Sequence, residues 1–113
     1  MIQIYHNTRC SKSRCALDLV EQSGQEFEVV KYLEDAPSVE VLKDIIKKLN
    51  IKPIELVRKG ETIWKEEFKD KDLSDEEIIN IMAANPILIE RPIIINGDKA
   101  VIGRPPESVM DIL

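Results

Sequence analysis

Apolar residues along the chain follow strand-like and helix-like spacings, and the order of these segments predicts an α/β protein. Residues 2–5 alternate and are rich in β-forming residues, and 27–33 repeat that character. Between them, from residue 11 to about 23, the apolar positions recur at the spacing of one helical face, and Gly24 is expected to end the helix. Two strands joined by a helix predict a parallel pair with a right-handed crossover.

The middle of the chain is expected to be helical. Pro37-Ser38 opens a helix with an apolar stripe, and Pro53 starts a short helix that reaches residue 57. Ser74 and Glu77 have the spacing of a capping box, which predicts a further helix that ends at residues 85–86. These segments form an enlarged helical block between the second strand and the last part of the chain.

The last quarter of the sequence predicts a hairpin and a closing helix. Residues 93–95 and 100–102 flank Asn96-Gly97, a strong hairpin signal, and Pro105-Pro106 can begin the helix. The order strand, helix, strand, helical block, hairpin and helix is the thioredoxin-like order. We therefore expect one domain over residues 1–113, a mixed four-stranded sheet with flanking helices and an enlarged central helical block.

Composition adds limits on partners and location. The chain has 113 residues, 43% of them hydrophobic, and a net charge of −5, so it can build one core and disfavours nucleic acid or an anionic membrane as a partner. No apolar run approaches the roughly 18 residues that span a bilayer, and the first residues lack the pattern of a signal peptide. Two cysteines then predict reduced thiols in the cytoplasm.

The stretch YHNTRCSKSRC, residues 5–15, holds the only histidine, both cysteines and three basic residues. Cys10 falls between the first strand and the first helix, where backbone N–H groups and the helix dipole lower a thiol pKa. The expected first turn has no carboxylate before Asp18, which favours a thiolate together with a bound oxyanion. The alternative is an inert buried cysteine with solvated basic neighbours.

Cys15 and His6 have different expected roles. Cys15 lies five positions after Cys10, about 140° around a helix of about 3.6 residues per turn, so the two thiols face apart. It also lies on the apolar stripe with Leu19, so we expect it to pack in the core. The reductant of Cys10 is then expected to come from outside the chain; the alternative is that Cys15 acts as a resolving cysteine. His6 either stabilises the thiolate, as a cation or hydrogen-bond donor, or is a plain surface residue. One histidine and two dissimilar cysteines make no metal site.

Three arginines stand apart from the solvated lysines and are candidates for oxyanion binding. Arg58 ends the short helix, Arg91 precedes Pro92 at the mouth of the hairpin, and Arg104 follows its second strand. Guanidinium groups bind tetrahedral oxyanions through a planar fork. The alternative for each arginine is a surface salt bridge with Glu55, Glu90 or Glu107. We expect a cis bond before Pro92, because thioredoxin-like folds commonly have one there.

Taken together, the segments IYHNTRCSKSR, VVKYLEDAPS, ELVRK and NPILIERPIIINGDKAVIGRPPE closely resemble the glutaredoxin-dependent arsenate reductase family of the ArsC type. The resemblance runs nearly end to end. It implies that Cys10 is the catalytic nucleophile. It also implies oxyanion-binding roles for Arg58, Arg91 and Arg104 and thiolate-tuning roles for His6 and Ser13.

The same resemblance implies the chemistry and the partners. Cys10 would attack arsenate to form a thiol–arsenate adduct, with glutathione as co-substrate and glutaredoxin completing the reduction to arsenite. No tightly bound cofactor is expected, and the chain is expected to be a monomer. The sequence departs from the usual pattern at Thr8, where many relatives have proline, and at Cys15.

Three other functions are left open by the residues. A redox-responsive regulator that binds RNA polymerase would have the same fold, but typically carries a C-x-x-C pair where this chain has Ser13. A monothiol glutaredoxin-like oxidoreductase would also lack that pair. Finally, arginines that bind arsenate would bind other tetrahedral oxyanions, so the substrate is open.

Overall fold

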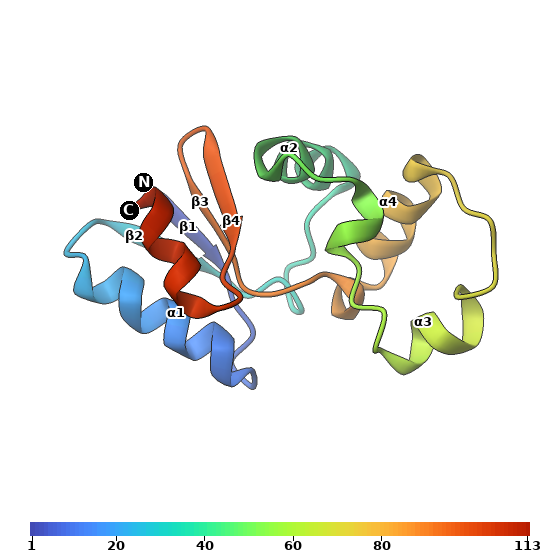
Figure 1. Ribbon diagram of the computed structural model, residues 1–113, viewed down its shortest axis with the longest axis horizontal. Helices are drawn as coiled ribbons and strands as arrows, with labels where there is room; N and C mark the ends of the chain where they lie inside the picture. The colour runs from blue at the N-terminus through green and yellow to red at the C-terminus, as the bar shows by residue number, and fades with distance from the viewer. The chain divides into compact units, whose positions relative to one another are not determined.

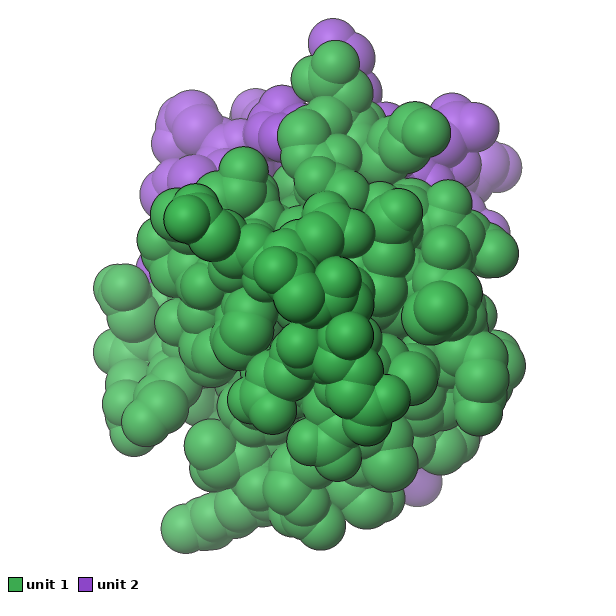
Figure 2. Space-filling model, turned by 90° about the vertical axis from the view of Figure 1, so that its left-hand side faces the viewer, with its two compact units in different colours: residues 1–35, 91–113 green, residues 36–90 purple.

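The computed structural model describes residues 1–113, which form two compact units. The first unit joins residues 1–35 to residues 91–113, and the second comprises residues 36–90; they are green and purple in Figure 2. The expectation of a single domain stays a prediction.

The first unit is built on a mixed four-stranded sheet, which confirms the expected fold class. The strands are β1 (Ile2–Tyr5), β2 (Phe27–Val30), β3 (Ile93–Asn96) and β4 (Lys99–Ile102). Their order is β2-β1-β3-β4, with β1 parallel to β2 and antiparallel to β3, and β3 antiparallel to β4. The parallel pair and the hairpin of the sequence prediction are therefore both present.

One face of this sheet is covered by α1 (Ser11–Gln22) and by the 3-10 helix η3 (Pro106–Ile112), which pack on each other (Figure 1). The core between these layers consists of fully buried apolar side chains from strands β1 and β3 and from both helices. They are Ile2, Ile4, Ala16, Val20, Ile94 and Val109. Burying this face fixes the start of α1 beside the carboxyl end of β1.

Two boundaries differ from the sequence prediction. The second strand ends at Val30, because β1 offers only four residues for pairing and the Lys31 carbonyl then accepts turn hydrogen bonds. In the hairpin, Asn96 pairs with Lys99, so the two turn residues are Gly97-Asp98 and not Asn96-Gly97. Gly97 has a φ of +64°, the left-handed region that favours glycine at the first turn position.

The second unit is helical, as expected for the enlarged block. Its elements are α2 (Val39–Leu49), η1 (Pro53–Leu56), α3 (Thr62–Glu67), α4 (Asp75–Ala84) and η2 (Pro86–Leu88). The capping box of α4 is confirmed: the Glu77 N–H donates to Ser74 Oγ at 3.2 Å, and the Ser74 N–H donates to Glu77 Oε1 at 3.1 Å. None of the helices in the chain is long and apolar enough to cross a membrane.

Candidate functional site

Cys10 occupies the N-cap position of α1, directly after the loop that leaves β1. Its backbone is extended, with φ −96° and ψ 120°, and the first helical turn contains no acidic residue. The sulfur therefore faces the positive end of the α1 dipole without a competing carboxylate. The side chain is partly exposed, so an external reactant can approach it.

The loop before Cys10 is held by Asn7 and Ser13. The Asn7 carbonyl accepts from the Cys10 N–H at 3.1 Å, and the Asn7 Oδ1 accepts from the Arg9 N–H at 3.0 Å. The Asn7 N–H in turn donates to Ser13 Oγ at 3.0 Å. Because Asn7 and Ser13 are buried, these bonds are shielded from water, and they fix where the Cys10 backbone enters the helix.

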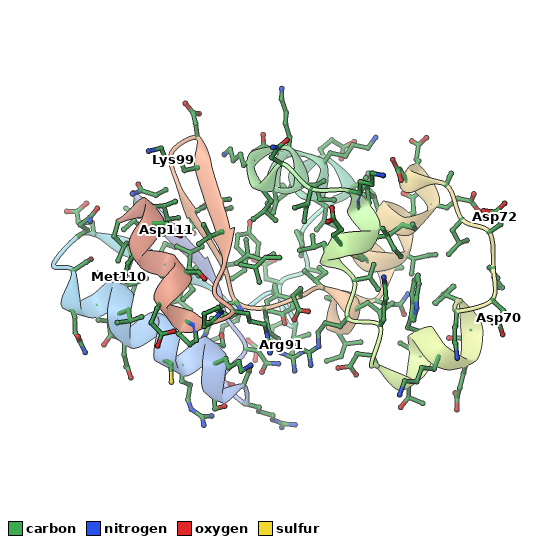
Figure 3. All side chains as sticks on the ribbon, in the orientation of Figure 1. Asp70, Asp72, Arg91, Lys99, Met110 and Asp111 are labelled. Atoms are coloured by element: carbon green, nitrogen blue, oxygen red, sulfur yellow. The ribbon has the colours of Figure 1, made fainter.

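Arg104, which follows β4 near the C-terminal end of the chain, places a positive charge beside the Cys10 sulfur. Its Nη2 lies 3.5 Å from Cys10 Sγ, and its Nε donates to the Arg91 carbonyl oxygen at 2.6 Å. Arg91, labelled in Figure 3, lies where the chain enters β3, and the bond before Pro92 is cis, as expected. The first unit thus gathers Cys10, Arg91 and Arg104 in one place.

Gly103 lets the end of β4 lie close to Pro92 and α1, and so allows Arg104 to reach the Cys10 sulfur. The Gly103 N–H donates to the Pro92 carbonyl oxygen at 2.8 Å. A Cβ at this position would lie 2.8 Å from Pro92 Cγ and 3.3 Å from the Ala16 Cβ of α1. Only a residue without a side chain lets the end of β4 lie this close to both segments.

The pKa of Cys10 is lowered from its ordinary value by the surrounding donors and cations. Burial alone raises the pKa, as it does for any thiol that loses water. The Ser13 backbone N–H, a hydrogen bond from Arg91 and the positive charges of Arg91 and Arg104 outweigh that effect. A larger share of Cys10 is therefore thiolate near neutral pH than for an ordinary cysteine.

His6 meets Ser13. Its Nδ1 lies 2.7 Å from Ser13 Oγ, and both side chains are buried. Burial lowers the pKa of His6, the charges of Arg14 and Lys31 lower it further, and a hydrogen bond with the Ser13 backbone opposes them in part. The neutral imidazole is thus favoured, so His6 supports the loop through Ser13 and does not supply a full positive charge to Cys10.

Cys15 lies on the exposed side of α1, and the prediction that it packs in the core is wrong. The buried face of α1 is formed by Ser13, Ala16 and Val20. Ala16 and Val20 of the expected apolar stripe are buried, but the third member of the buried face is Ser13, a polar residue that hides the register and makes Cys15 look like part of the stripe. Cys10 and Cys15 are both free thiols.

Arg58 belongs to the second unit and forms ion pairs there. Its Nη1 lies 3.1 Å from Glu90 Oε1, and its Nε lies 3.3 Å from Glu61 Oε1. The partner Glu90 was among the salt-bridge alternatives for the arginines. No group of three or more histidine, cysteine, aspartate or glutamate side chains in the chain is arranged to hold a metal ion.

Comparison with known proteins identifies the family to which this arrangement belongs. The ArsC family model matches residues 5–112. The chain belongs to the ArsC family. An arsenate reductase of Haemophilus influenzae is 46% identical to this ArsC-family chain and covers 97% of both chains. The uncharacterized protein YfgD of Escherichia coli is also 46% identical, over 99% of this chain and 96% of its own.

The solved structures agree with the fold of this ArsC-family chain. A structure described as an arsenate reductase from Vibrio cholerae matches it with a TM-score of 0.94 and 45% identity, over 99% of this chain and 97% of that one. The family resemblance drawn from the sequence motifs is thus confirmed, together with the fold class.

Sequence reasoning missed Asn7, Gly103 and the contact that Arg14 makes. The Arg14 Nη1 donates to the Thr8 carbonyl oxygen at 3.0 Å, which ties the loop to the first turn of α1. An asparagine ahead of an N-cap is a known turn former and was a usable signal for Asn7. For Gly103 the sequence holds no such signal, because the need for glycine arises from segments distant along the chain.

Proposed function

We propose that this protein is an arsenate reductase that uses Cys10 as its nucleophile, glutathione as co-substrate and glutaredoxin as the final reductant. The observation that carries the proposal is the grouping of the Cys10 sulfur with Arg91 and Arg104 at the start of α1. In a chain of net charge −5, this local concentration of cations around a thiolate favours an anionic substrate. The arsenate reductases among the relatives support arsenate as that anion.

In the first step, the Cys10 thiolate attacks arsenic(V) of a bound arsenate and forms a sulfur–arsenic bond. A hydroxyl group leaves the arsenic and departs as water after it takes up a proton. Arg91 and Arg104 stabilise the negative charge on the remaining arsenate oxygens, an electrostatic role. Arsenic is still in the +5 state in the resulting adduct, so this step involves no net electron transfer.

In the second step, two external thiols supply the two electrons that reduce arsenic(V) to arsenic(III). Glutathione attacks the adduct, and the thiol of glutaredoxin then forms a mixed disulfide with that glutathione. Glutathione displaces a second hydroxyl of the adduct as water, and when glutaredoxin removes the glutathione, the electron pair of the broken sulfur–arsenic bond stays on arsenic. Water then replaces the Cys10 sulfur on arsenic(III), so arsenite leaves and Cys10 returns as a thiolate. The electron count closes, because two thiols become one disulfide while arsenic gains two electrons.

The dependence on outside thiols is supported by the position of Cys15. No C-x-x-C pair is present, since Ser13 stands at the second position and its hydroxyl is occupied by His6 and Asn7. Cys15 is five positions along the helix from Cys10, and both thiols are free. We therefore assign the resolving thiol to a partner.

Arg58, His6 and Ser13 have proposed roles of different kinds. Ser13 supports the thiolate through its backbone N–H, and His6 acts by positioning Ser13. The oxyanion-binding role of Arg58 rests on the family resemblance, while its ion pairs with Glu61 and Glu90 give it a structural role in its own unit. We also propose a monomer that works in the cytoplasm without a bound cofactor.

The test is arsenite release from arsenate in the presence of glutathione and glutaredoxin, with each component omitted in turn. The proposal predicts arsenite only in the complete mixture. If glutathione alone supports the full rate, the assignment of glutaredoxin is wrong. If no thiol reductant of any kind yields arsenite, the reductase function itself is refuted.

A further inference from the structure

A cavity lies entirely within residues 54–78 of the second unit and plays no part in the chemistry above. Its volume is about 540 Å³, within the range of pockets that hold small organic ligands. The lining comes from η1, α3, the α3–α4 connection and the start of α4. Asp70 and Asp72 mark the connection in Figure 3, and Asp72 is part of the lining.

The cavity has an apolar wall and a cationic rim. Ile54, Trp64, Leu73 and Ile78 supply the apolar wall, and Trp64 is only 6% exposed. The rim carries four lysines against two aspartates, in a protein whose net charge is −5. The lysines are Lys59, Lys65, Lys69 and Lys71. This excess of positive charge at one hollow surface runs against the charge of the whole chain.

The rim lysines are not neutralised by ion pairs within the chain. The lysines that pair with carboxylates are Lys43 and Lys48, which belong to α2. Lys71 is instead positioned over the Phe68 ring, with its Nζ 5.5 Å from the ring centroid. Phe68 in turn packs against Trp64, with 5.8 Å between the two ring centroids. The aromatic pair therefore stabilises the wall and holds one of the cations beside it.

From this combination we propose that the cavity binds a small amphiphilic anion, an apolar chain or ring that ends in a single carboxylate. The apolar part would pack against Trp64, Leu73 and Ile78, where it loses contact with water. The carboxylate would lie at the rim among the lysine ammonium groups. A neutral amphiphile lacks the attraction to the rim lysines, and a small inorganic anion lacks the packing against the apolar wall. Each should therefore bind more weakly than the amphiphilic anion.

Trp64 makes this proposal directly measurable, because it is the only tryptophan in the chain and it lines the cavity. The experiment titrates the full-length protein with decanoate, below the concentration at which decanoate forms micelles, and follows tryptophan emission. Decanol and inorganic phosphate serve as the neutral and the purely ionic comparisons. We expect a saturable change with decanoate and about five-fold weaker binding of decanol, the upper end of the range for loss of one surface charge pair.

Two double variants locate the site. Lys65→Gln with Lys69→Gln removes two rim charges, whereas Lys47→Gln with Lys99→Gln removes two exposed charges elsewhere. We expect the rim variant to weaken decanoate binding by about three- to ten-fold and the control variant to leave it unchanged. Circular dichroism checks that both variants and the decanoate complex keep the native helix content.

Several outcomes would overturn the proposal. Emission that changes without saturation indicates non-specific association and not a binding site. Equal affinity for decanol and decanoate means that the rim lysines do not bind the carboxylate. Equal weakening by the rim and control variants means that net charge, not the cavity, governs binding. Arsenite release is not a readout here, so failure of this proposal leaves the proposed reductase function untouched.

Discussion

Replacing Arg104 by alanine tests the electrostatic account of the Cys10 thiolate. Arg104 lowers the pKa of Cys10, so its removal raises that pKa, and the thiolate forms only at higher pH. The guanidinium Nη2 lies 3.5 Å from the sulfur. With a water-like dielectric constant of about 80, two unit charges at that separation interact by about 1.2 kcal/mol, which corresponds to roughly seven-fold in an equilibrium constant.

The assay is a pH titration of the thiolate by its ultraviolet absorbance, in a Cys15→Ser background so that Cys10 is the only thiol. On the acid side of the titration, the thiolate fraction is expected to fall roughly seven-fold in the Arg104→Ala protein. At high pH the two proteins converge, because both are then fully ionised. Arg104→Lys keeps the charge but loses the planar contact with the Arg91 carbonyl, so it should fall between them.

Arg9→Ala is the matched control, since Arg9 lies in the same loop with an exposed side chain and is not among the groups that lower the Cys10 pKa. If Arg9→Ala shifts the titration as much as Arg104→Ala, general charge is responsible and not the placement of Arg104. An unchanged titration in Arg104→Ala would refute the reasoning altogether.

Two further substitutions test the packing around the site. Ser13→Ala leaves His6 Nδ1 and the Asn7 N–H, both buried, without their partner. It should therefore lower the free energy of unfolding, measured by urea denaturation, by about 1–3 kcal/mol. Ser11→Ala, at an exposed position, should change that free energy little. Gly103→Ala places a methyl group 2.8 Å from Pro92 Cγ and should cost about 1–3 kcal/mol together with a loss of arsenite release. Gly60→Ala meets no atom within 4 Å and serves as its control; equal effects of the two glycine substitutions would contradict the role of close packing at Gly103.

Much of the fold could be predicted because its signals are local. The capping box at Ser74 and Glu77, the glycine that ends α1 and the alternation in β1 each depend on neighbouring residues. The sequence predicts the turn of the hairpin one residue too early, because Asn96-Gly97 has the better local turn sequence. In the structure, Asn96 is held in β3 by pairing with Lys99 and by its own side chain, which donates to the Ile112 carbonyl.

The candidate site could be predicted only in part, because some of its contacts join residues that are distant along the chain. The N-cap position of Cys10 follows from the end of one element and the start of the next, so it could be predicted. The contact of Arg104 with that sulfur joins residues 94 positions apart, and motif resemblance alone suggested it. The exposure of Cys15 was mispredicted because a buried serine interrupts the apolar stripe of α1.

The central claim is that the Cys10 sulfur, and not Cys15, attacks arsenate. The most direct test measures arsenite release by Cys10→Ser and by Cys15→Ser with glutathione and glutaredoxin present. The account predicts no arsenite above background from Cys10→Ser and a rate close to wild type from Cys15→Ser, since Cys15 lies on the exposed side of α1. Arsenite release by Cys10→Ser at the wild-type rate would contradict it.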